Sequence, residues 1–418
     1  MLAPPMSIAR EVRAHCTAIA AYSRDARMYL LASMFMAVSI AIQNVLYNLY
    51  LYELGLDERV IGQVAGAVAA GIALGGIPAG LLYDRFGGRF AFRLSTAAIA
   101  LCMVLRVITT HPNMLVFWAA ANGLAFSVYY VSIFPFITSS SQPRERPYLY
   151  ASNLAVWTAL MVVGSLVSGH IVELLASVLP NAAAIVHHRF ALLSGAMIAV
   201  LAILPLSRMG NQNTRSDGAR RGLLPSARSG CAIARGAVVL VLMGLVVGLT
   251  SPFYNIYFKR VFGASEVLIG SLFSLSQLVA LLSAFVLPYV IRRWGLVRSP
   301  SIILALTAPF LIAVGLEVPL AFVAAAFLVT AGMERLAEAP IMNLVMEAVE
   351  PTDRGAMSGI RLVCTYSSQA IAGAVGGWIV VDLGYSSLFV LAAGVVLLAA
   401  CGLWFLFHES PAWLVSTQ

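Results

Sequence analysis

Charged residues are scarce in this sequence. Only 11% of its 418 residues are charged, whereas 61% are hydrophobic. A soluble protein carries about 25% charged residues, so the deficit excludes a soluble globular chain and predicts an integral membrane protein. The five cysteines have no metal-ligand or redox spacing, which argues against a thiolate site. We expect them to be inert thiols that face lipid or the protein core.

The patterns that several other function classes need are also missing. No short cleavable signal precedes the first apolar run, and no glycine-rich phosphate loop indicates transport driven by ATP. The histidines all fall in loops or near predicted helix ends, so no nucleophile–base or metal constellation is expected at membrane depth. They are His15, His111, His170, His187, His188 and His408. We therefore predict no enzyme, no cofactor and no metal.

What the sequence does have is twelve apolar stretches of about 20 residues, each long enough to cross a bilayer as a helix. They start near Met28, Val60, Phe90, Met114, Leu149, Phe190, Gly236, Glu266, Pro300, Pro319, Ala356 and Ser386. Only the connection 207–235 is long, and its Gly, Ser, Asn and Arg content predicts a linker. The predicted organisation is a cytoplasmic leader at 1–27, six-helix halves at 28–206 and 236–408, and a cytoplasmic tail at 409–418.

The positions of the basic residues predict how these helices are oriented in the membrane. Most of the 26 basic residues lie in the leader or in the even-numbered connections. The positive-inside rule then places both termini in the cytoplasm. The net charge of +8 is thus a topology signal, and we expect a lipid bilayer, with no nucleic acid as a partner. The bacterial inner membrane is the predicted location.

The two halves resemble one another. Residues 47–50 (Tyr-Asn-Leu-Tyr) recur as 254–257 (Tyr-Asn-Ile-Tyr), and a shift of 208 places Gly87 on Gly295. A nearly constant offset through several loops indicates an internal repeat. Two parallel repeats are typical of secondary transporters, whose solute site lies between the repeats near the bilayer midplane. The predicted fold class is therefore all-α, with two pseudo-symmetric six-helix bundles.

The connection between the second and third predicted helices carries a longer motif. Residues 80–89 read Gly-Leu-Leu-Tyr-Asp-Arg-Phe-Gly-Gly-Arg and resemble the loop signature G-x-L-x-D-R-x-G-x-R of the major facilitator superfamily. Gly80 allows close helix approach, and Gly87 allows a turn with positive φ. The resemblance implies that Asp84 bridges to the start of the eleventh helix, near 355–358, and latches the halves on the cytoplasmic side. The alternative is a basic loop that only obeys the positive-inside rule.

Two more loops look like parts of the same latch. Residues 143–146 and 351–355 are similar to the acidic–Arg pairs that open helices five and eleven in the superfamily. In the second half Arg292 takes the place of Asp84, so we expect an asymmetric latch. The predicted latch residues are Gly80, Asp84, Arg85, Gly87, Arg89, Arg146 and Arg354.

Three charges stand deep in the tenth predicted helix. At 1.5 Å per residue, Glu334 is roughly 22 Å from Pro319 and about 18 Å from Met346, which is near the midplane. A charge at that depth is costly, so it predicts a functional site. Glu338 shares a face with Glu334, and Arg335 can pair with Glu338. Glu334 is left to pair with another helix, to bind solute or to stay protonated. The alternative is a closed Arg–Glu network that braces the second half.

Further candidate binding residues lie on the helices that line the central cavity in the superfamily. Asn44 and Asn48 lie one turn apart and could bind solute or join helices. Tyr50, Tyr52 and Tyr257 are expected in an interfacial aromatic belt or an outer gate. Arg106 is expected to snorkel to the outer interface. The predicted substrate- or proton-binding residues are Glu334, Arg335, Glu338, Asn44, Asn48, Tyr130 and Asn255.

These observations predict a monomeric secondary active transporter. It would move a small organic solute or ion by alternating access, coupled to protons through the carboxylates of helix ten. One alternative is an uncoupled facilitator or exchanger in which the Glu–Arg–Glu network is structural. An alternative from another class is a membrane sensor that transports nothing.

Overall fold

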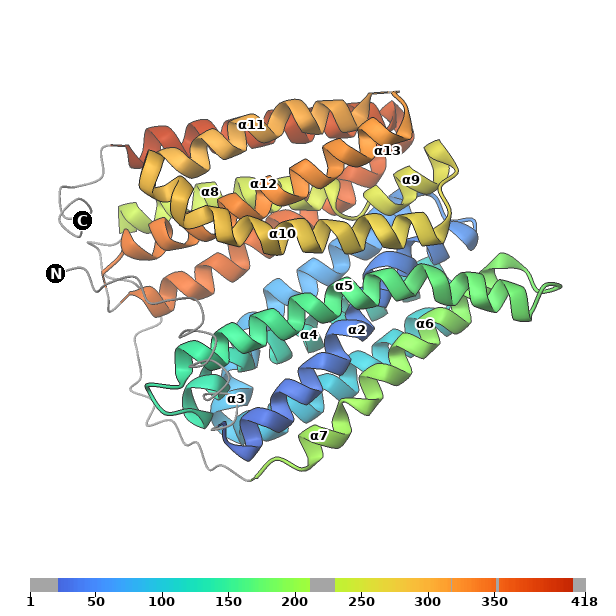
Figure 1. Ribbon diagram of the computed structural model, residues 1–418, viewed down its shortest axis with the longest axis horizontal. Coiled ribbons are helices and arrows are strands. Elements are labelled where there is room, and N and C mark those ends of the chain that lie inside the picture. Colours follow the sequence, from blue (N-terminus) through green and yellow to red (C-terminus); the bar gives the residue numbers. More distant parts are fainter. Residues whose placement is uncertain (1–21, 211–229, 317, 351–352, 409–418) are drawn as a thin grey trace.

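All regular elements that the structure describes are helices (Figure 1). This computed structural model describes residues 22–210, 230–316, 318–350 and 353–408. The helices are α2 (Arg24–Glu53), α3 (Glu58–Ile108), α4 (Pro112–Ser140), α5 (Arg146–Val178), α6 (Ala184–Leu201), α7 (Ile203–Ser207), α8 (Gly230–Thr250), α9 (Tyr254–Phe262), α10 (Glu266–Trp294), α11 (Arg298–Gly315), α12 (Leu320–Glu347) and α13 (Arg354–Phe407). Most of the predicted leader and linker, and the whole predicted tail, lie outside the described residues.

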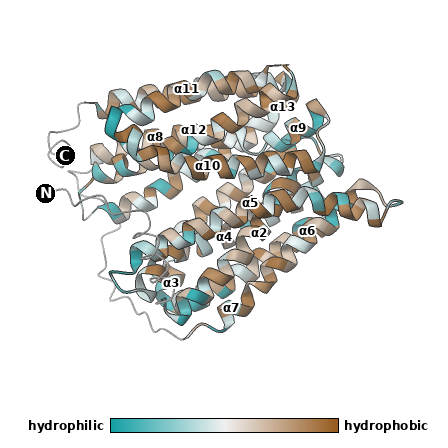
Figure 2. Cartoon of the chain, viewed as in Figure 1, coloured by the Kyte–Doolittle hydropathy of each residue, from teal (hydrophilic) through white to brown (hydrophobic). Residues whose placement is uncertain are grey.

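The helices make this a multi-pass membrane protein. Ten helical segments of the described chain are long and apolar enough to cross a membrane, and hydrophobic residues cover most of their length (Figure 2). Two of these segments belong to α3 and α13, which have 51 and 54 residues. At 1.5 Å per residue, continuous helices of these lengths would span about 77 and 81 Å, more than twice the hydrocarbon core of a bilayer. Each contains one glycine with non-helical backbone, Gly87 in α3 and Gly384 in α13.

The internal repeat is visible in the backbone. Gly87 has φ 79°, as its sequence motif predicts, and Gly295 has φ 83°. A second pair at the same shift of 208 residues, Gly55 and Gly263, has φ 77° and 61°. L-residues with a side chain rarely adopt these angles, so the same turns end the same helices in both halves.

Helix starts repeat as well. The side chain of Asp57 accepts a backbone N–H of the first turn of α3 at 3.1 Å, and Ser265 does so for α10 at 3.2 Å. Such caps satisfy donors that the helix leaves free. The next residue is a glutamate in both cases, Glu58 and Glu266, where a negative charge suits the helix dipole.

The halves meet mainly along two pairs of helices. Helices α2 to α7 form one half and α8 to α13 the other, with α3 packed against α13 and α5 against α10 across the interface. In Figure 1 the halves converge where α9 lies and separate toward the start of α2 and the end of α13. We call the converged end, which holds α9 and the first turns of α3 and α10, the closed end.

Burial decides between two expectations for the tyrosines and overturns one for an arginine. Tyr50 and Tyr257 are buried, so the aromatic-belt interpretation is wrong for both, and the outer-gate interpretation stays a prediction. Their hydroxyls donate to the carbonyl oxygens of Val107 and Val314, each at 2.6 Å, and a shift of 207 residues relates the two bonds. Arg106 is only 7% exposed and stacks 3.7 Å over the Tyr47 ring. It does not snorkel, because that ring offers its cation a partner inside the protein.

Candidate functional site

Two asparagines tie the halves together at the closed end. The side-chain amide of Asn48 in α2 donates to the carbonyl oxygen of Pro252 at 2.8 Å. The amide of Asn255 in α9 donates to the carbonyl oxygen of Val45 at 2.9 Å. A shift of 207 residues carries Asn48 onto Asn255 and Val45 onto Pro252, so each bond is the counterpart of the other. Such reciprocity is the mark of a contact around a two-fold axis.

Backbone contacts on either side of the asparagines follow the same symmetry. A Cβ added to Gly62 of α3 would lie 2.4 Å from the carbonyl oxygen of Gly373 in α13. A Cβ added to Gly270 of α10 would lie 2.6 Å from the carbonyl oxygen of Ser165 in α5. A shift of 208 relates these contacts too. Small residues therefore let both helix pairs approach to backbone distance.

Glu58 is the charged centre of one side of the closed end. Its side chain is 2% exposed and accepts hydrogen bonds from the guanidinium of Arg260 in α9 and, at 2.8 Å, from the hydroxyl of Tyr385 in α13. Both partners come from the other half. The neighbouring Arg59 forms an ion pair with Asp382 of α13. A buried carboxylate needs such partners to stay charged, so this cluster joins the halves.

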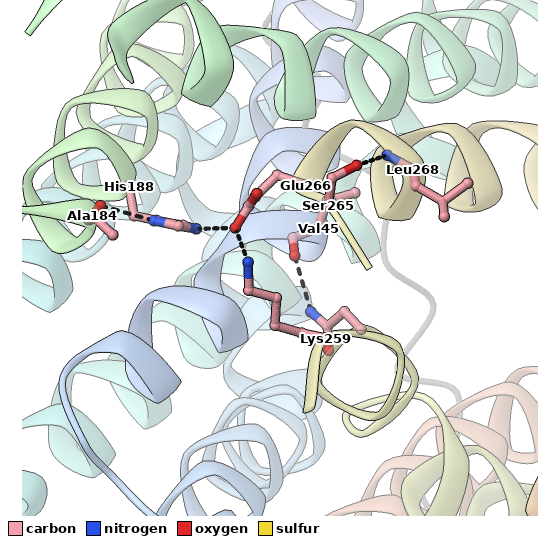
Figure 3. A network of polar contacts seen from close by, with 8 residues as sticks. Val45, Ala184, His188, Lys259, Ser265, Glu266 and Leu268 are labelled. Atoms are coloured by element: carbon pink, nitrogen blue, oxygen red, sulfur yellow. Dashed lines mark hydrogen bonds and ion pairs between the residues drawn. The ribbon is translucent and has the colours of Figure 1, made fainter. Parts of the chain in front are cut away.

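Glu266, the repeat counterpart of Glu58, has different partners (Figure 3). Its Oε1 accepts a hydrogen bond from Nζ of Lys259 in α9 at 2.6 Å. The same oxygen lies 3.7 Å from Nε2 of His188 in α6, whose side chain is 1% exposed. Lys259 belongs to the same half as Glu266, whereas His188 belongs to the other. The imidazole is thus the cross-half partner of Glu266.

The predicted deep cluster lies on α12. Arg335 donates to Oε2 of Glu338 at 2.9 Å, as the i,i+3 spacing predicts, and the two side chains are 57% and 50% exposed. Glu334 is different, because its Oε1 is buried and has no hydrogen-bond partner among the described residues. Glu334 is therefore the carboxylate of the cluster that Arg335 does not bond.

Aromatic side chains from several helices approach this cluster. The phenol of Tyr254 in α9 lies within electrostatic range of Glu334. The phenol of Tyr366 in α13 lies within range of Arg335 and also of Tyr130 in α4. Tyr130 comes from the first half and Arg335 from the second. Tyr366 therefore has polar neighbours in both halves.

The model of the Major Facilitator Superfamily matches this chain over residues 29–238 and 236–416. The chain belongs to this superfamily. An uncharacterized MFS-type transporter of Yersinia pestis (strain Pestoides F) is 26% identical over 168 residues, which are 40% of this chain and 44% of the relative. One from Enterobacter sp. (strain 638) is 25% identical over 234 residues, 54% and 58% of the two chains. The chain thus spans about half the length of the curated relatives it matches.

Solved structures of the superfamily share the fold. The nucleoside transporter NupG is 14% identical with a TM-score of 0.75, covering 93% of this chain and 100% of NupG. A bacterial homolog of the human lysosomal transporter Spinster, inward-facing and occupied, is 14% identical with a TM-score of 0.73, covering 92% and 96%.

The predicted latch residues of the superfamily motif lie at the end opposite the closed end. Asp84 and Arg85 are exposed, and no hydrogen bond or ion pair joins Asp84 to any described residue. A Cβ on Gly80 would meet nothing within 4 Å. Arg89 donates to the carbonyl oxygen of Ser207 at 3.2 Å, within its own half. The latch itself stays a prediction.

The remaining predicted residues are placed individually. Arg146 and Arg354 are the first residues of α5 and α13, so both acidic–Arg loops do open helices. Asn44 is exposed and lies one turn before Asn48 in α2. Among the described residues, no three His, Cys, Asp or Glu side chains gather as metal ligands.

Sequence reasoning missed the charged residues of the closed end. Glu58, Arg260, Glu266 and His188 were not among the predicted site residues. One signal was present, because Glu58 and Glu266 repeat at the shift of 208 that relates the halves. An acidic residue directly follows a helix cap at equivalent positions of both halves. This equivalence indicates a shared role.

Proposed function

We propose that this protein is a secondary active transporter that moves a small organic solute or ion by alternating access. The observation that carries the proposal is the reciprocal bonding of Asn48 and Asn255 across the halves at one end. A pseudo-two-fold contact of this kind forms and breaks as the two halves rock. Membership of a superfamily of transporters supports the same reading.

The proposal includes a topology. The breaks at Gly87 and Gly384 divide α3 and α13 into two crossings each, which gives twelve crossings in all. Both termini then lie in the cytoplasm of a bacterium, and the closed end faces away from it. In this orientation the described conformation is inward-facing, with the predicted Asp84 latch released. We propose that the monomer is the working unit.

The contacts at the closed end are of a strength that suits gating. Each hydrogen bond contributes on the order of 1 kcal/mol net. A few such bonds keep one conformation in the majority. The other conformation stays populated, since alternating states typically differ by a few kcal/mol. NupG is named for nucleosides, and a small organic solute of that size is the class we propose here.

We further propose that protons drive transport through Glu334. Its Oε1 is buried without a hydrogen-bond partner in the described part of the chain, whereas Glu338 is bonded to Arg335. A carboxylate in that setting gains or loses a proton as its surroundings change between water-filled and closed. The Arg335–Glu338 bond favours a second candidate, an uncoupled facilitator in which the whole cluster is structural.

Transport assays separate these candidates. The full-length protein in liposomes is screened for uptake of a panel of nucleosides, sugars, amino acids and amines under an imposed pH gradient. We expect Glu334→Gln to lose uphill accumulation and to keep exchange of labelled for unlabelled solute, because a permanently neutral residue cannot carry a proton. Glu338→Gln, one turn away, is the matched control and keeps partial accumulation. Equal accumulation by parent and Glu334→Gln would overturn proton coupling through Glu334.

A further inference from the structure

The two repeat-related glutamates of the closed end are held by chemically different partners. Glu58 is bonded by an arginine and a tyrosine, and Glu266 by a lysine, with a histidine 3.7 Å away. Among these four partners, only an imidazole ordinarily changes its charge between pH 5 and 8. At the closed end, the symmetry of the two glutamates is therefore broken by the one partner that ordinarily titrates in this range.

The geometry of His188 fixes which nitrogen takes that proton. Nδ1 lies 3.0 Å from the carbonyl oxygen of Ala184. A carbonyl oxygen only accepts, so Nδ1 carries a hydrogen in either protonation state. Nε2 lies 3.7 Å from Oε1 of Glu266 and is buried without a hydrogen-bond partner among the described residues. In the neutral ring the Nε2 lone pair faces a carboxylate oxygen, and in the protonated ring an N–H faces it (Figure 3).

We propose that His188 and Glu266 form a proton-binding site that holds the closed end shut. The proton sits on Nε2 of His188 and links α6 of the first half to α10 of the second. This inference rests on the proposed alternating access, because it needs a state in which the two residues separate. When the halves part at this end, Glu266 no longer faces the imidazolium and the site loses its proton.

The sign of the pH effect follows from linkage. The closed conformation binds the proton more tightly, so protonation favours that conformation by the same factor. The stabilisation of the closed conformation is complete at the acidic side of the pH range in which an imidazole ordinarily titrates. It is lost as the pH rises through that range. The pH of the compartment that the closed end faces thus sets how readily that end opens.

Other charged groups near His188 are already engaged or lie at the surface. Lys259 is bonded to Glu266. On α6 itself, Nε2 of His187 lies 3.0 Å from the carbonyl oxygen of Leu179. The remaining groups, on α6 and the helices packed against it, are Arg189 bonded to Tyr50, Arg106 stacked on Tyr47, and the exposed His170 and Glu173.

Spin-label distances test the site without a known solute. Nitroxides are placed on Asn181→Cys and Val261→Cys, exposed positions of opposite halves at the closed end, in a full-length background without native cysteines. The protein is reconstituted in lipid nanodiscs at pH 5 and pH 8. We expect the ratio of short to long distances to be at least about fivefold higher at pH 5, within the usual range of coupling factors.

Two variants decide the assignment. His188→Gln keeps a hydrogen-bond donor for Glu266 but cannot titrate, so its distance ratio should be the same at both pH values. His187→Gln is the matched control and should keep the pH response of the parent. A parent ratio that does not change with pH, or a response retained by His188→Gln, would overturn the proton site.

The same distance measurements test the proton site and alternating access separately. Two distance populations in a ratio independent of pH would leave alternating access standing and remove the proton site. A single population at both pH values and in all variants would contradict alternating access itself.

Discussion

Glu334 and Glu338 lie one helical turn apart on α12, and their surroundings give them different chemistry. Glu338 accepts a hydrogen bond from Arg335 and is half exposed. Glu334 buries an oxygen that no described side chain bonds. An unpaired carboxylate at membrane depth is costly to keep charged, whereas a paired one is not. At the scale of single residues, the cluster therefore combines one carboxylate oxygen without a described partner and one bonded Arg–Glu pair.

The reciprocal asparagines give a prediction about single residues. Asn48→Ala and Asn255→Ala should each weaken the closed end by about 1 kcal/mol, the net contribution of one hydrogen bond. That is roughly a fivefold change in the ratio of the two conformations, and the symmetry of the bonds predicts similar effects for both variants. The measurement is the rate of labelling of a cysteine placed at the closed end. Asn44→Ala, an exposed neighbour on the same helix, should leave that rate unchanged.

At the scale of helices, backbone contact between α3 and α13 and between α5 and α10 defines how close the halves come. Gly62 lies against the carbonyl oxygen of Gly373, and Gly270 against that of Ser165. The obstacle to a Cβ is backbone in both cases, so no side-chain rotation relieves it. These two crossings are therefore sensitive to a single added methyl group.

Gly62→Ala and Gly270→Ala should prevent full closure and reduce transport about fivefold or more. An overpacked helix contact costs typically 1–3 kcal/mol, which shifts the equilibrium between the two conformations by a factor of about 5 to 150. Proteoliposome uptake measures the loss. The control is Gly359→Ala in α13, where an added Cβ meets nothing within 4 Å. Equal loss in the control would indicate a general effect of alanine on these helices instead of a clash at the crossing.

At the scale of the whole molecule, the two ends differ. The closed end holds the paired asparagines and the ion pairs of Glu58 with Arg260 and of Arg59 with Asp382. At the opposite end Asp84 is exposed. Asp84 has no hydrogen bond or ion pair to any described residue in this conformation. We therefore expect its predicted bridge to the start of α13 in the state in which the closed end has opened.

Asp84→Asn should accordingly lower the population that is open at the closed end. Removing the charge weakens a charge-assisted hydrogen bond, which contributes about 1.5–3 kcal/mol. Spin-label distances across both ends should show more of the conformation described here, by about tenfold or more. Arg292→Gln, at the repeat counterpart of Asp84, should have a smaller effect because the second half lacks the acid. Identical distances in Asp84→Asn and parent would remove the latch.

Local features were predictable because they depend on residues close in the chain. Apolar length predicted the helices, and the positive φ of Gly87 and the Arg335–Glu338 pair followed from glycine chemistry and helical spacing. The burial of Tyr50 and Arg106 was not predictable from their position near a helix end. Their partners are Val107, 57 residues away, and Tyr47, 59 residues away, and no local pattern encodes such distances.

The class of protein, the repeat and the family followed from composition, repeat offset and motif, which are properties of the chain alone. Which repeated residues meet depends on the packing of the two halves. Asn48 and Pro252 are 204 residues apart, and Asn255 and Val45 are 210 apart. Only the docking of one half on the other brings such pairs within hydrogen-bond distance. The charges of the closed end depend on the same docking, because Glu58 and Glu266 have partners on the opposite half only where the two halves meet.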